Sequence, residues 1–111
     1  MPEPDPELDA LRARWLQLIR HDLPRAASAR PDWPIRLDHC FARVILDHVC
    51  GRPWREVLSA PAYKHLSVEQ LRQGLELGRS LIENQTDLGE LNRRSLQSRG
   101  KRLARYASTT A

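Results

Sequence analysis

The residues best suited to bind a metal lie in two similar stretches, Leu-Asp-His-Cys ending at Cys40 and Leu-Asp-His-Val-Cys ending at Cys50. Histidine nitrogen and cysteine sulfur are ligands that zinc prefers. On one helix, at about 100° per residue, His39 and His48 would face opposite sides. Because the chain also has no Cys-x-x-Cys or His-x-x-x-His pair, its spacing predicts neither a metal site nor another cofactor site.

The two cysteines are also candidates for a disulfide or a nucleophile. Ten residues along a helix correspond to about 15 Å, which is too far for Cys40 and Cys50 to bond to each other. Cys40 has Arg36 and Arg43 within one turn, but it lies on an apolar stripe, where a free cysteine behaves as a small hydrophobe. Two free thiols are typical of a reducing compartment, so we expect a cytoplasmic protein.

A polar ribbon crosses the most apolar stretch of the chain. Arg43 and Asp47 are four residues apart and can pair, either facing solvent or within a buried network that includes Tyr63 or Asn92. A pocket there would suit a small ligand, as a binding protein or as an enzyme. Since no catalytic signature is present, we favour binding over catalysis. The candidate ligand site comprises Asp38, His39, Arg43, Asp47, Trp54 and Tyr63.

The strongest functional signal is the basic C-terminal segment. Six of the 18 bases and none of the 14 acids follow Glu90, which leaves twelve bases and 14 acids in residues 1–90. Such a set suits phosphate contacts that depend on salt more than on sequence. An acidic protein is the alternative partner, and a run of charge can also be a solvated face. The expected contact residues are Arg93, Arg94, Arg99, Lys101, Arg102 and Arg105.

Helices must position these residues. A chain of 111 residues predicts one domain, and its leucine-rich composition with few β-branched residues favours helix over sheet. No apolar run approaches the roughly 20 residues that span a bilayer, so we expect no membrane contact. The sequence predicts an all-α bundle of four main helices plus one short helix around a central helix over 33–50. Residues 1–100 form the helical domain, and 101–111 form a basic, partly disordered tail.

The first half of the chain contains two helix starts. Asp5, followed by proline, can cap a helix that runs to about His21, and we expect Pro24 to end it and 25–31 to be a linker. Asp32 can cap the central helix, which would begin at Trp33 or Pro34. Gly51 is the expected left-handed terminator of that helix.

The second half contains two capping motifs. A short helix is expected from Pro53 to Leu58. Ser67-Val-Glu-Gln is a capping box that opens a helix to about Glu83, and Asp87-Leu-Gly-Glu repeats the pattern for a last helix to about Ser98 that buries Leu91 and Leu96. Gly74 and Gly78 lie four apart, which allows close approach by another helix. This face suggests a homodimer as a third hypothesis, that of a self-associating structural protein.

Three segments carry a resemblance to a known family: Pro34 to Trp54, Pro61-Ala-Tyr-Lys-His-Leu-Ser, and Leu91-Asn-Arg-Arg-Ser-Leu-Gln-Ser-Arg-Gly-Lys. They resemble a small family of bacterial and fungal proteins, some of which bear the name of GCN5-related acetyltransferases. That enzyme fold needs a mixed sheet and a glycine-rich turn after a strand, and the sequence predicts neither. The resemblance implies an independently folding unit and transfers no catalytic residue.

Overall fold

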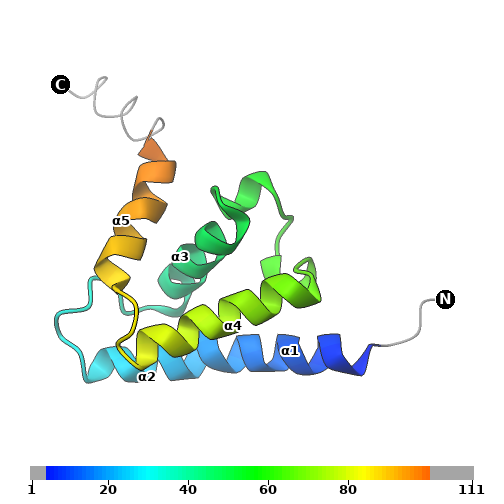
Figure 1. Ribbon diagram of the computed structural model, residues 1–111, viewed down its shortest axis with the longest axis horizontal. Coiled ribbons are helices and arrows are strands. Elements are labelled where there is room, and N and C mark those ends of the chain that lie inside the picture. The colour runs from blue at the N-terminus through cyan, green and yellow to red at the C-terminus, as the bar shows by residue number, and fades with distance from the viewer. Residues whose placement is uncertain (1–4, 101–111) are drawn as a thin grey trace.

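The described part of the chain, residues 5–100 of a computed structural model, is all-α and contains no strand (Figure 1). Four main helical segments are present, as the sequence predicted. The first is one continuous helix made of α1 (Pro6–Gln17), a π-helical turn (Leu18–Asp22) and α2 (Leu23–Ser28). The others are α3 (Asp38–Cys50), α4 (Val68–Ile82) and α5 (Leu88–Ser98). No described helix is long and apolar enough to cross a bilayer.

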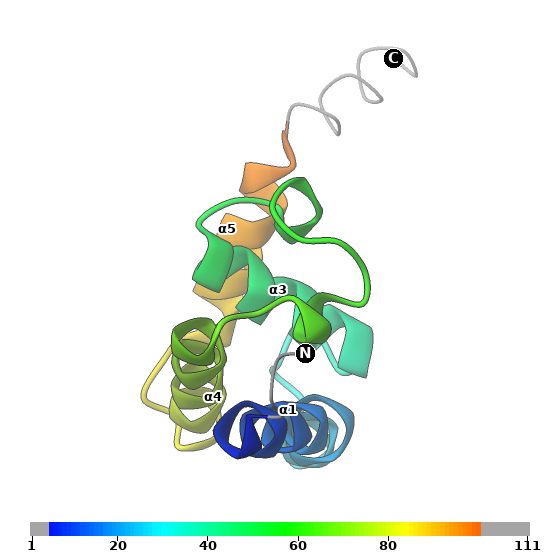
Figure 2. The same ribbon diagram turned by 90° about the vertical axis from the view of Figure 1, so that its right-hand side faces the viewer.

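Helices α1 and α4 lie side by side, α3 packs on α4, and α5 packs on α3 (Figures 1 and 2). Four consecutive residues of α3, from Val44 to Asp47, are buried, and Phe41 on the same helix is fully enclosed. A helix that is apolar around much of its girth belongs in the interior. The predicted central position of this helix is therefore confirmed.

Pro24 does not end the first helix, contrary to the expectation from the sequence. The turn before it is π-helical, with the Leu23 N–H donating to the Leu18 carbonyl five residues back. Proline lacks an N–H and crowds the preceding turn of an α-helix, and a wider turn accommodates it. The added residue also turns both Leu18 and Ile19 toward the core, where each is 6% exposed. The helix therefore runs on to Ser28, through most of the expected linker.

The central helix begins at Asp38, later than predicted, and Asp32 does not cap it. The preceding segment is not helical because Trp33 and Ile35 insert into the core, each only 8% exposed. The Trp33 ring meets Phe41 edge-on, with the ring centroids 5.7 Å apart. At the other end, Gly51 has φ 71°, which confirms the predicted left-handed terminator.

Two arginine side chains donate hydrogen bonds to carbonyl oxygens at the C-terminal ends of helices. Arg30 donates to the carbonyl oxygens of Leu81, at 2.9 Å, and Ile82 at the end of α4. Arg36 donates to the carbonyl oxygen of Ala27 in the last turn of α2, at 2.5 Å, and to that of Arg30 just beyond the helix, at 3.2 Å. A planar guanidinium can bind two acceptors at once, and positive charge is favourable at a helix C-terminus.

The capping box of α4 is confirmed. The Ser67 hydroxyl accepts from the Gln70 N–H at 3.1 Å, and the Gln70 side chain accepts from the Ser67 N–H at 2.9 Å. A Cβ on Gly74 would lie 2.6 Å from Cζ3 of Trp15, and a Cβ on Gly78 would overlap the side chain of Leu18. The close approach that the glycines allow is therefore used within the chain, by Trp15 of α1 and by Leu18 of the π-helical turn that follows it.

The turn from α4 to α5 is fixed by hydrogen bonds at both helix ends. The Gln85 N–H donates to the Ser80 carbonyl and the Asn84 N–H to the Leu81 carbonyl, a Schellman motif in which Asn84 has φ 61°. Asp87 then caps α5 by accepting from the Glu90 N–H at 3.2 Å. The short helix expected from Pro53 to Leu58 is a single 3₁₀ turn, Trp54–Glu56, and a second 3₁₀ turn, Ala62–Lys64, follows it before α4.

Candidate functional site

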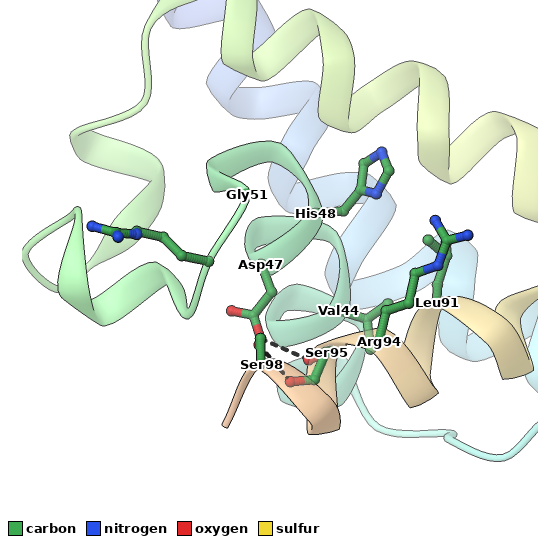
Figure 3. A pocket seen from close by; sticks show the side chains of 9 residues that line it. Val44, Asp47, His48, Gly51, Leu91, Arg94, Ser95 and Ser98 are labelled. Carbon is green, nitrogen blue, oxygen red and sulfur yellow. Dashed lines mark hydrogen bonds between the residues drawn. The ribbon is translucent and has the colours of Figure 1, made fainter. Parts of the chain in front are cut away.

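A hydrogen-bonded network joins α3 to α5. Arg43 on α3 donates to the side-chain oxygen Oδ1 of Asn92 at 2.7 Å and to the Ser95 hydroxyl at 2.6 Å. Ser95 in turn donates to Oδ2 of Asp47 at 2.6 Å (Figure 3). The direction is fixed because a guanidinium has no acceptor and a carboxylate no donor. The polar ribbon thus forms a network that includes Asn92, one of the two predicted neighbours.

Asp47 is the centre of this network. Its side chain is 3% exposed, and it accepts from Nε and Nη2 of Arg99 at 3.1 and 2.9 Å. The backbone N–H of Trp54 donates to the same carboxylate at 2.9 Å. Both carboxylate oxygens are therefore satisfied within the protein. Arg99, which the sequence placed among the expected nucleic-acid contacts, is turned toward Asp47 and is 29% exposed.

A cleft of about 190 Å³ lies between the C-terminal end of α3 and the face of α5 that carries Leu91, Arg94, Ser95 and Ser98 (Figure 3). Its apolar floor is Val44 and Leu91. Three bases line it, and two of them, His48 and Arg52, were not among the predicted site residues. The side chain of His48 is exposed. The lining residues are Val44, Asp47, His48, Gly51, Arg52, Leu91, Arg94, Ser95 and Ser98.

On α5, Arg93 and Arg94 are exposed, as predicted, and both bind Glu90. Arg93 donates to Glu90 at 2.9 and 2.5 Å, and Nε of Arg94 donates at 3.1 Å. The hydrogen bonds from Arg93, followed by the one from Arg94, lower the pKa of Glu90 to about 2. Leu96 is 42% exposed, and Ser95 is buried in its place, contrary to the predicted helix face. Lys101, Arg102 and Arg105 lie outside the described residues.

The structure brings together only part of the candidate ligand site. Arg43, Asp47 and Trp54 meet through the network described above. Asp38 and His39 contact each other at 3.5 Å in the first turn of α3, about 13 Å along the helix from Asp47. The sixth residue, Tyr63, packs against the core from the second 3₁₀ turn.

The cysteines are free and half-buried. Burial, and then the nearby Asp47 carboxylate, raises the pKa of the Cys50 thiol. A raised pKa lowers the fraction of thiolate, which does not suit a nucleophile. Within residues 5–100 no group of three or more His, Cys, Asp or Glu side chains could hold a metal ion.

Comparison of the chain with protein-family models, curated proteins and solved structures finds no match.

Proposed function

We propose that this protein is a small helical binding module whose basic C-terminal segment, Arg93 to Arg105, contacts nucleic acid. The observation that carries the proposal is the anchoring of α5 on α3 through Asp47. The anchored helix exposes Arg93 and Arg94, and the sequence that follows adds bases and no acid. A charged segment on a fixed helix loses less conformational entropy on binding than a free one.

Nucleic acid is the favoured partner because it presents regularly spaced phosphates, and an arginine fork matches phosphate oxygens well. An acidic protein is the second candidate, since it offers the same sign of charge. The free thiols of Cys40 and Cys50 fit a cytoplasmic place of action.

Two other hypotheses have less support. A small-ligand site or an enzyme site would need a cleft at the polar ribbon, and the α3–α5 cleft provides one of modest size beside Asp47. A homodimer through Gly74 and Gly78 would need a free glycine face, and α1 already covers that face. Nucleic-acid binding is therefore the function that we would test first.

The test is a fluorescence anisotropy titration of labelled, mixed-sequence duplex and single-stranded oligonucleotides with the full chain, at low and at physiological salt. The diagnostic variant removes three bases that follow the described residues, by Lys101→Gln, Arg102→Gln and Arg105→Gln. A second variant, Arg93→Gln with Arg94→Gln, removes two bases from α5. Its matched control is Arg20→Gln with Arg25→Gln, which removes the same charge from exposed positions of the first helix.

Binding by the natural chain should weaken steeply with salt. The α5 variant should lower the slope of log K against log salt by about 2 for duplex, while the control should leave the slope unchanged. Equal losses in the α5 variant and its control would mean that only net charge matters. Absence of binding by the natural chain would refute the proposal.

A further inference from the structure

We infer that the α3–α5 cleft holds a phosphate group of the bound nucleic acid, with Arg52 and Arg94 as its anchoring arginines and His48 beside them. This inference rests on the proposed function. It adds the end of α3 to a contact surface that the sequence confined to the C-terminal segment.

The charge of the cleft favours an anion. Three of its lining residues are bases, and its single acid is Asp47. The Asp47 carboxylate is buried and already accepts from Arg99, Ser95 and the Trp54 N–H. Because that negative charge is matched by the Arg99 guanidinium, it offsets little of the positive potential from the cleft's own bases.

Hydrogen-bond donors remain available at the cleft. Nε of Arg94 donates to the Glu90 carboxylate. The two terminal nitrogens of Arg94 make no hydrogen bond within residues 5–100. Arg52 makes neither a hydrogen bond nor an ion pair with any residue in that range. Ser98 donates its hydroxyl hydrogen to the Ser95 carbonyl at 2.7 Å, which leaves it as an acceptor. The two arginines and His48 are therefore the side chains equipped to bind an anion.

The size of the cleft and its position fit a backbone phosphate. A volume of about 190 Å³ compares with roughly 30 Å³ for one water in the liquid, so a phosphate and several waters can enter. A guanidinium can bind two phosphate oxygens in parallel. Arg94 also belongs to the exposed basic face of α5, so a strand bound to that face can place one phosphate in the cleft.

The test compares Arg52→Gln with Arg55→Gln in the full chain. Both residues are exposed and both changes remove one positive charge, but the Arg55 guanidinium lies 5.2 Å from the Trp54 ring centroid and Arg55 does not line the cleft. In the titration with single-stranded oligonucleotide, Arg52→Gln should weaken binding about three- to tenfold at low salt and lower the salt slope by about 0.7. Arg55→Gln should weaken binding less than about twofold.

A second measurement needs no variant. Titration of the ¹⁵N-labelled natural chain with a short oligonucleotide should shift the amide signals of Gly51 and Ser98, which line the cleft. The amide signal of Gly78, which is buried in α4 against Leu18 of the first helix, should stay in place.

The outcomes separate the two proposals. If the natural chain binds but Arg52→Gln equals Arg55→Gln, and the Gly51 and Ser98 signals do not move, the cleft assignment is wrong and the proposed function stands. If the natural chain does not bind, both are wrong. If poly-glutamate of similar charge binds as tightly and depends equally on Arg52, the cleft is not selective for phosphate and the inference is overturned.

Discussion

Arg99 reaches back from the end of α5 to Asp47 in α3 and binds its carboxylate through two nitrogens, Nε to Oδ2 at 3.1 Å and Nη2 to Oδ1 at 2.9 Å. The apolar residues of α5 that are buried, Leu88 and Leu91, belong to its first half. Polar contacts to α3 therefore hold the second half, the part that leads into the basic tail.

Asp47→Asn should destabilise the protein by about 3 kcal/mol, because an amide nitrogen would face the donors of Ser95 or Arg99 and leave them unpaired. Urea unfolding followed by circular dichroism measures the change. The control is Asp38→Asn on the same helix, an exposed site where we expect a change within about 0.5 kcal/mol. Equal midpoints for the two variants would contradict the central role of Asp47.

Gly78→Ala should destabilise the protein by about 1–3 kcal/mol, although alanine favours helix by about 1 kcal/mol, because the added methyl group overlaps Leu18. Gln73→Ala, at an exposed position of α4, should change stability by less than about 0.5 kcal/mol. Thermal or urea unfolding checks both. A Gly78→Ala protein as stable as the natural chain would show that Leu18 of the first helix does not pack closely on this face.

Asn84→Ala should cost about 1 kcal/mol, because Asn84 has φ 61° and alanine is disfavoured in the left-handed region. Asn84→Gly should leave the protein as stable or slightly more stable, since glycine adopts this conformation without strain. Comparison of the two unfolding midpoints gives the answer. The prediction fails if alanine and glycine are equivalent at this position.

Acid should weaken the ion pairs of Glu90. The pKa of Glu90 is lowered from its ordinary value of 4.5 to about 2, so the pairs with Arg93 and Arg94 stabilise the folded chain above pH 4.5. That contribution is lost as the pH falls from 4.5 toward 2. Urea midpoints measured across this range should show a smaller acid dependence in Glu90→Gln than in the natural chain. Glu69→Gln, at an exposed site on α4, is the control and should leave the dependence unchanged.

The sequence predicted the elements whose signals are local. The capping box at Ser67, the cap at Asp5 and the terminator Gly51 each depend on residues within about four positions, and all three are confirmed. The apolar pattern of residues 41–46 likewise identified the central helix. These features were predictable because short-range hydrogen bonds and helical periodicity determine them.

Two local rules failed where tertiary packing opposed them. Pro24 lies inside a continuous helix because a π-helical turn precedes it. The first two residues of that turn, Leu18 and Ile19, are both buried in the core. The segment before Asp38 is not helical because Trp33 and Ile35 are buried there. The gain from burying these side chains outweighs local preferences of about 1 to 3 kcal/mol.

The sequence by itself determined the helical class of the protein and the excess of positive charge after Glu90. Only the tertiary structure decided how the bases are used. It pairs Arg99 with Asp47, 52 residues away, and brings Arg52 to the same cleft as Arg94. Composition counts these arginines alike. Arg99 is paired beside a buried carboxylate, whereas Arg52 and the two terminal nitrogens of Arg94 are exposed at the cleft and make no hydrogen bond within residues 5–100.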